Sequence, residues 1–221
     1  MSDFLTFAAA HLPAILAVLP VTLLMWALAM LIGAGLGLVL ATARLYGGKV
    51  SYGLATTYVE IFRGTPMLVQ MFFIYLGLPE VGIVLDPLPA AVIAIGLNSA
   101  AYQAEYFRGA VRSIPQGQMA AARAIGMTRM GALRNVLLPQ ALRRVIPQWS
   151  NEAILELKYT SIAYAIGVSE MTAVAEQIGY KSFKFFEAFL LVGIVYVILT
   201  GILAQVLHIV EQRTSIPGVN R

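Results

Sequence analysis

Two short segments place opposite charges three residues apart in otherwise apolar surroundings. Glu60-Ile-Phe-Arg63-Gly64 recurs as Glu105-Tyr-Phe-Arg108-Gly109. Glu and Arg at positions i and i+3 share a helix face and can neutralise each other. The two pairs are interpreted either as structural ion pairs near a membrane interface or as polar groups that line the path of a solute.

The segment Lys158-Tyr-Thr-Ser161 carries an ammonium group and three hydroxyls in four consecutive residues. These groups suit the carboxylate and the polar groups of a small solute, and a charge at membrane depth is a functional candidate by default. The alternative is an ion pair of Lys158 with Glu152 or Glu156 inside a helix bundle. The candidate substrate-pathway residues are Arg63, Gln70, Asn98, Glu105, Lys158, Thr160 and Ser161.

The residue types predict no enzyme and no metal site. The chain contains no cysteine, which excludes disulfides, thiolate metal sites and cysteine nucleophiles. His11 and His208 are isolated, and Ser161 with such distant histidines is not a catalytic constellation. Gly47-Gly-Lys-Val50 lacks the spacing and the final hydroxyl of a phosphate-binding G-x-x-x-x-G-K-[ST] loop, so ATP chemistry must come from another chain.

The composition requires a membrane. The chain has 59% hydrophobic and 12% charged residues and a mean hydropathy of +0.79, whereas about 25% of the residues of a soluble domain are charged. A hydrocarbon core about 30 Å thick needs about 20 apolar residues in a helix. We predict an all-α integral membrane protein with a single transmembrane domain over residues 1–221. Its five spans are predicted at about 18–42, 54–78, 88–108, 145–169 and 187–210.

The basic residues predict the orientation. With these spans, eleven of the fifteen Lys and Arg fall on one face, and only Lys181 and Lys184 fall on the other. Membrane proteins collect Lys and Arg on the cytoplasmic side, so the net charge of +4 does not indicate nucleic-acid binding. The N-terminus is therefore expected outside and the C-terminus in the cytoplasm. The N-terminus also lacks the basic region of a signal peptide, so the first span is expected to be retained.

Glycines in the first predicted span indicate close helix packing. Gly33, Gly35 and Gly37 provide small residues at helical spacing. Small residues let the backbones of two membrane helices approach closely. We therefore interpret them as a packing face and not as part of a binding site.

The predicted cytoplasmic loop, about 109–144, has helical segments of its own. Gln118–Ile125 is rich in strong helix formers. Gly126 follows at the position where a left-handed residue commonly ends a helix. A second short helix is expected over about Thr128–Leu137, and Pro139 then lies where a new helix can begin. A helix–glycine–helix loop with small alanine faces is typical of a docking surface.

This loop resembles the coupling loop of ABC importer permeases, whose pattern is Glu-Ala-Ala, three residues, Gly, about nine residues and Ile-x-Leu-Pro. Ala121-Ala122 precede Gly126 by the right spacing, and Val136–Pro139 closes the pattern. Glu60–Pro66, Gln70–Tyr75 and Leu157–Ser161 resemble the permeases of the polar amino-acid family, the histidine, glutamine and arginine type. The resemblance covers roughly residues 18–212.

Two positions depart from the family pattern. The leading Glu of the loop motif is Ala120 here, so the contact made by that acid is either different or dispensable. The Lys-Asp-Thr-Ser of the family is Lys158-Tyr159-Thr-Ser here, which removes the acidic neighbour of Lys158. Glu156, Glu152 or the carboxylate of a bound solute could take its place.

The resemblance implies the core fold of a type I ABC importer permease in a prokaryotic inner or plasma membrane. It implies two permease subunits, identical or homologous, two ATPase subunits that bind ATP and Mg²⁺, and an extracytoplasmic solute-binding protein. The implied ATPase-coupling residues are Ala120, Ala121, Ala122, Gly126 and Pro139. The alternative is an ATP-independent channel or secondary carrier for small polar solutes. An odd span number without inverted halves argues against the carrier.

Overall fold

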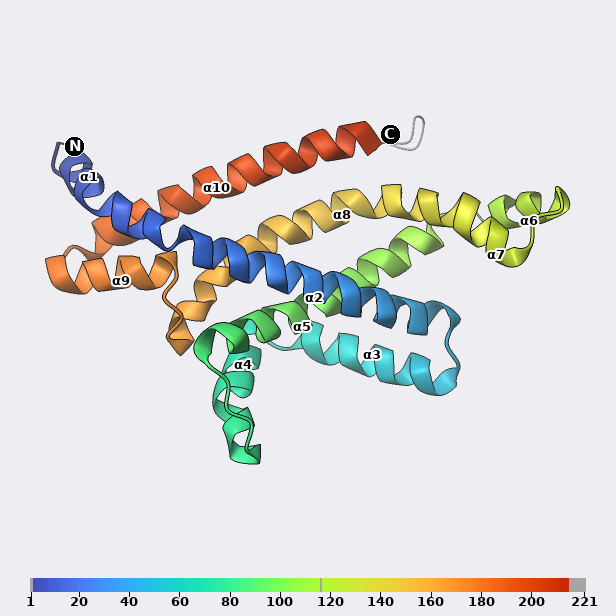
Figure 1. Cartoon of the computed structure of the whole chain (residues 1–221), viewed down its shortest axis with the longest axis horizontal. Helices are drawn as coiled ribbons and strands as arrows, with labels where there is room; N and C mark the ends of the chain where they lie inside the picture. The colour runs from blue at the N-terminus through green and yellow to red at the C-terminus, as the bar shows by residue number, and fades with distance from the viewer. Residues whose placement is uncertain (1, 116, 215–221) are drawn as a thin grey trace.

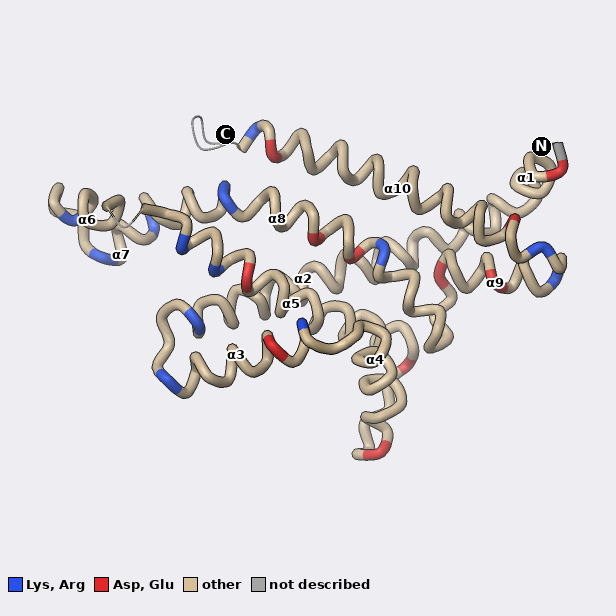
Figure 2. Tube along the Cα trace, turned by 180° about the vertical axis from the view of Figure 1, so that it is seen from behind, with Lys and Arg blue, Asp and Glu red and all other residues tan. Residues whose placement is uncertain are grey.

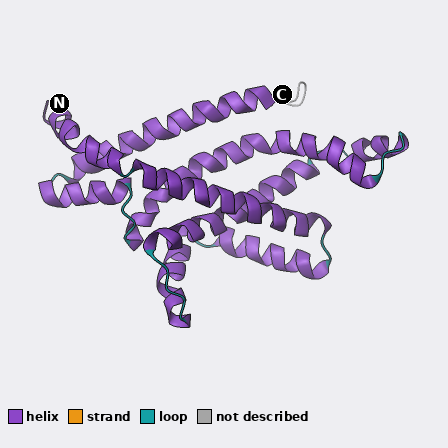
Figure 3. Cartoon of the chain, viewed as in Figure 1, coloured by secondary structure: helices purple, strands orange, loops and turns teal. Residues whose placement is uncertain are grey.

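The computed structural model describes residues 2–115 and 117–214, and every regular element in these ranges is helical (Figures 1 and 3). The main helices are α1 (Ser2–Ala17), α2 (Leu19–Tyr46), α3 (Lys49–Gly64), α4 (Met67–Phe72), α5 (Pro87–Arg112), α6 (Gly117–Ala124), α7 (Arg129–Ala132), α8 (Leu138–Tyr159), α9 (Met171–Ser182) and α10 (Phe185–Thr214). The all-helical architecture agrees with the predicted fold class.

The long helices run side by side between two ends of different character. Helices α6 and α7 lie at one end, and α1 and α9 lie at the other (Figure 1). Figure 2 shows Lys and Arg gathered near α6, α7 and the turn between α2 and α3, with a smaller group near α9. This separation of charge along the long axis is the arrangement that an oriented membrane protein requires.

Helix α2 packs closely against α5 because two of its glycines lack side chains. A Cβ atom on Gly33 would lie 2.4 Å from Nε2 of Gln103, and one on Gly37 would lie 3.1 Å from the backbone oxygen of Ala100. A Cβ atom on Gly35 would meet nothing within 4 Å. The packing interpretation is therefore confirmed for Gly33 and Gly37, whereas Gly35 takes no part in it.

Gly37→Leu is expected to destabilise the protein, and Gly35→Leu is expected to have little effect. The backbone of α5 lies against Gly37 and cannot rotate away as a side chain would. Overpacking of a close contact costs about 1–3 kcal/mol. Thermal unfolding of the two variants in the same detergent measures the difference. Equal midpoints for both variants would contradict the close approach of α2 and α5.

The predicted span at 54–78 is not a continuous helix. Helix α3 ends at Gly64, α4 begins at Met67, and the two halves are bent by 109°. Pro66 disfavours a helical conformation of the residue before it, and Thr65 is extended, with φ −116° and ψ 145°. The predicted span at 54–78 stays a prediction, and its helix is broken at Thr65.

The number of spans stays a prediction. Among the described residues, α2 and α10 are long and apolar enough to cross a membrane, and the bent pair of α3 and α4 makes a third candidate. Helices α5 and α8 have 26 and 22 residues but contain more polar side chains. Some of these polar residues are buried between helices, namely Asn98, Ser99 and Gln103 of α5 and Ser150, Glu152 and Glu156 of α8.

The predicted span at 145–169 is not one continuous α-helix. Helix α8 ends at Tyr159 and continues as a tighter 3₁₀ turn, Thr160–Ile166. That turn stops at Gly167, which has φ +89°. Glu170 then caps α9, because its carboxylate accepts hydrogen bonds from the backbone N–H groups of Thr172 and Ala173, both at 2.9 Å.

Candidate functional site

Gly126 ends α6 in the conformation that the sequence predicts. Its φ is +87°. The N–H of Gly126 donates to the carbonyl of Arg123 at 3.0 Å, and the N–H of Met127 donates to the carbonyl of Ala122 at 3.1 Å. These two bonds form a Schellman motif, in which a left-handed residue satisfies the last carbonyls of a helix. The turn therefore sets the angle between α6 and the chain that follows.

The surface of α6 and α7 offers small and apolar side chains to a partner. Ala120 and Ala121 are exposed, whereas Ala122 is buried against the rest of the chain. Ile125 is 80% exposed and Met130 is 69% exposed. Exposed apolar side chains on a segment that extends from the end of the bundle are candidates for a protein or membrane contact. Of the three alanines, Ala120 and Ala121 are accessible in the described chain and Ala122 is not.

The second helix of the loop forms over the predicted residues, with Thr128 as its N-cap, but it is not separate from the helix that follows. Helix α7 covers only Arg129–Ala132 and passes through a π-helical segment, Leu133–Leu137, directly into α8. Pro139, which is exposed, therefore does not start a separate helix. A proline lacks an N–H and its ring displaces the carbonyl four residues earlier. The wider π-helical turn in front of Pro139 accommodates this without ending the helix.

A side chain of α8 ties the two ends of this loop together. Nη1 of Arg144 donates to the backbone oxygen of Ser113 at 2.7 Å and to its Oγ at 3.1 Å. Ser113 caps the C-terminus of α5, where helix carbonyls attract a positive charge. The contact fixes the end of α5 against α8, the two helices that carry the loop.

Only one of the two predicted Glu–Arg pairs forms. Glu105 forms ion pairs with Arg108, as expected, and also with Arg44 of α2. Arg63 instead lies over the ring of Tyr102, 5.3 Å from its centroid. No ion pair joins Arg63 and Glu60 in the described part of the chain, and both are exposed. The first pair was a wrong prediction.

Gln70 and Asn98, two candidate pathway residues, hold the bend between α3 and α4. Nε2 of Gln70 donates to the backbone oxygens of Phe62 and Thr65 at 2.8 and 3.0 Å. Nδ2 of Asn98 donates to the same Phe62 oxygen at 3.1 Å and to Oε1 of Gln70 at 3.0 Å. These bonds satisfy carbonyls that the end of α3 leaves free. Their observed role is structural.

A buried polar cluster links α5 and α8. Oε1 of Glu152 accepts from Ser99 at 3.3 Å, and Oε2 accepts from Tyr106 at 3.0 Å. Gln103 donates to Ser99 at 2.9 Å and accepts from the indole of Trp149 at 2.9 Å. Polar groups in a membrane helix face the bundle interior and mark solute paths by default. The cluster is therefore a second candidate site.

Glu156 lies one helical turn beyond Glu152. It is 1% exposed, and neither of its carboxyl oxygens has a hydrogen-bond partner among the described residues. Lys158 is exposed and pairs with neither glutamate in that part of the chain, so the predicted ion pair is wrong. Thr160 and Ser161 donate their hydroxyls to backbone oxygens three residues back. An uncompensated buried carboxyl group is costly and marks a place for a donor or a cation.

The sequence contains a signal for this cluster outside the motifs named above. Ser99 and Gln103 are four residues apart on α5, and Glu152 and Glu156 are four residues apart on α8. Residues at this spacing lie on one helix face. Two polar stripes in two predicted spans therefore indicate helices that pack through polar faces.

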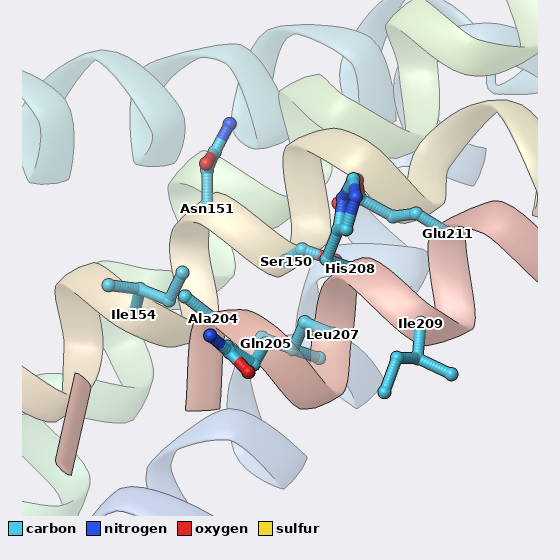
Figure 4. Close-up of a pocket in the computed structure, with 9 residues that line it drawn as sticks. All are labelled: Ser150, Asn151, Ile154, Ala204, Gln205, Leu207, His208, Ile209 and Glu211. Carbon is cyan, nitrogen blue, oxygen red and sulfur yellow. The ribbon is translucent and has the colours of Figure 1, made fainter. Parts of the chain in front are cut away.

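A separate groove of about 580 Å³ with a mixed polar and apolar lining lies between α8 and α10 (Figure 4). Ser150 and Asn151 line it from α8, and Gln205, His208 and Glu211 line it from α10. The hydroxyl of Ser150 is buried without a hydrogen-bond partner in the described chain. None of the candidate pathway or coupling residues lines this groove.

Comparisons with known proteins identify the family of the chain. Residues 33–216 match the family model described as "binding-protein-dependent transport system inner membrane component". The chain belongs to this family. It is a permease subunit of an ATP-driven importer and not an enzyme, and the alternative of an ATP-independent carrier has no support among its relatives.

Two curated relatives cover most of the permease. It is 39% identical over 214 residues to the probable amino-acid permease protein YxeN of Bacillus subtilis (strain 168), with 96% of each chain covered. It is 40% identical over 186 residues to the glutamine transport system permease protein GlnP of Escherichia coli (strain K12), with 83% of this chain and 85% of the relative covered.

A solved structure confirms the fold of the permease. The crystal structure of an amino acid ABC transporter with histidines matches with a TM-score of 0.89 and 34% identity. The match covers 96% of this chain and 98% of the other. The expected core fold of a type I ABC importer permease is therefore confirmed.

Proposed function

We propose that this permease carries polar or charged amino acids inward across a prokaryotic inner membrane. It works as one of two permease subunits, identical or homologous, with two ATPase subunits and an extracytoplasmic solute-binding protein. ATP and Mg²⁺ are bound by the ATPase subunits. The names of the relatives, an amino-acid permease and a glutamine permease, support the substrate class.

The structural observation that supports an amino acid as the substrate is the buried carboxyl group of Glu156, which has no hydrogen-bond partner among the described residues and lies next to the Glu152 cluster. Every amino acid has an ammonium group, and such a group would offset the cost of burying this carboxyl. Glu156 is closed off in the described conformation. The subunit must therefore open when the ATPases change state, and ligand contacts that differ between the two states drive the change.

The test is uptake into proteoliposomes. The permease is reconstituted with its ATPase and binding protein, and uptake of each common amino acid is measured with and without ATP. ATP-dependent uptake of a polar or charged amino acid is the expected result. Uptake that persists without the ATPase would instead favour a channel or secondary carrier.

Lys158→Met is expected to lower amino-acid uptake by about tenfold while the complex still assembles. The ammonium group of Lys158 is exposed and forms no ion pair in the described chain, so its loss leaves no buried charge behind. A charge-assisted hydrogen bond to a solute contributes about 1.5–3 kcal/mol. Uptake and co-purification of the ATPase are measured together. Normal uptake by Lys158→Met would remove this residue from the pathway.

The orientation is testable because the chain has no cysteine. We expect Ala120 in the cytoplasm and Val84, which is 79% exposed between α4 and α5, outside. In intact cells an impermeant thiol reagent should label Val84→Cys and should label Ala120→Cys only after lysis. The reverse pattern would invert the proposed topology, with the N-terminus inside and the C-terminus outside.

A further inference from the structure

An apolar cavity of about 430 Å³ lies beneath the coupling loop. The ends of α2 and α5 form one side, and the chain from α7 to the start of α8 forms the other. Its walls are apolar almost throughout, with Leu38, Leu45, Phe107, Leu137 and Ala141 among the residues that line it. The hydroxyl of Thr42, at the wall, already donates to the backbone oxygen of Leu38.

Such a cavity is unsuited to water. A bound water needs two to four polar partners, and apolar cavities of this kind stay dry. At the edge of a membrane, the apolar material at hand is the acyl chain of a lipid. The size and lining of the cavity therefore fit part of one acyl chain.

One charged side chain belongs to the lining. Arg134 lines the cavity, is exposed, and forms no ion pair or hydrogen bond in the described part of the chain. No acidic residue lines the cavity. The surrounding end of the molecule is rich in Lys and Arg (Figure 2). Basic pockets between membrane helices on the cytoplasmic side bind anionic lipid headgroups.

We propose that this cavity binds an anionic phospholipid, with one acyl chain between α2, α5 and α8 and the phosphate on Arg134. The proposal rests on the orientation given above, which places this end in the cytoplasmic leaflet. The lipid would touch both the membrane helices and the π-helical segment Leu133–Leu137 that leads from the coupling loop. It would therefore brace the loop against the bundle.

The experiment measures phosphatidylglycerol bound to the purified permease–ATPase complex by native mass spectrometry, against phosphatidylcholine as the neutral reference. Arg134→Gln removes the charge at the cavity. Thr42→Phe fills the part of the cavity proposed to hold the acyl chain and leaves Arg134 in place. Arg143→Gln is the matched control, because Arg143 is an exposed arginine of α8 that does not line the cavity.

Arg134→Gln is expected to weaken phosphatidylglycerol binding by about fivefold, Thr42→Phe to weaken binding of both lipids, and Arg143→Gln to have no effect. Equal losses for Arg134→Gln and Arg143→Gln would overturn the proposal in favour of general surface attraction. Unchanged binding by Thr42→Phe would overturn the placement of the chain. Lipid binding is measured on the purified complex and does not require transport. A negative result for lipid binding is therefore distinguishable from a negative result in the uptake test.

Discussion

Gly126→Val is expected to leave the permease in the membrane and to abolish ATP-driven transport. The φ of Gly126 is +87°, and a β-branched residue in that region is a genuine outlier. A side chain there costs about 1–2 kcal/mol or more through the backbone alone. A Cβ atom on Gly126 would meet nothing within 4 Å, so the effect comes from the turn and not from a clash. We expect the strain to change the angle that the Gly126 turn sets between α6 and the chain that follows.

Uptake into proteoliposomes and co-purification of the ATPase measure this effect. Gly126→Asn is the control, since asparagine enters the left-handed region more readily than other side chains. It should retain most of the transport. Equal transport by Gly126→Val and the parent permease would show that the angle of α6 does not matter for coupling.

The turn at Gly126 was predictable because its determinants are local. A run of helix formers followed by glycine specifies both the end of α6 and the left-handed residue. The contact of Gly37 was predictable in part, since small residues four apart let another helix approach, although the same pattern also included Gly35, which meets nothing within 4 Å. In both cases a few neighbouring residues carry the signal.

The charged pairs show where local reasoning fails. Glu60 with Arg63 and Glu105 with Arg108 have the same spacing. Only Glu105 forms its pair, and it gains Arg44 from a helix sixty-one residues away in sequence. Arg63 instead lies over the ring of Tyr102. The packing of α2, α3 and α5 decides which residue each charged side chain contacts. A five-residue pattern carries no information about this packing.

Hydropathy also hid two features of the site. The charge-free run after Arg63 suggested a continuous span, although Pro66 carried the signal for the break at Thr65. Glu152 and Glu156 lower the hydropathy of the predicted span at 145–169, although both side chains are buried. An average over a window cannot separate a polar residue that faces another helix from one that faces lipid.

Arg144→Met is expected to lower transport while ATP hydrolysis continues. Arg144 is the α8 side chain that holds the cap of α5, through two hydrogen bonds to Ser113. Bonds from a charged donor contribute about 1.5–3 kcal/mol. Without them the coupling loop is carried by two helices that can shift against each other, so ATP-driven closure moves the loop without moving the bundle. The amount of amino acid transported per ATP hydrolysed should fall by about tenfold or more.

The neighbouring arginine provides the control for this variant. Arg143 is exposed and makes no contact with Ser113, so Arg143→Met removes the same charge from α8 without releasing α5. A purely electrostatic role, such as attraction of the ATPase, predicts similar losses in both variants and a strong dependence on salt. A mechanical link predicts that only Arg144→Met lowers the transport ratio while ATP hydrolysis and assembly persist. Because the bond joins α5 and α8, the two helices that also enclose the polar cluster, the same contact would connect the ATPase contact surface with the solute path.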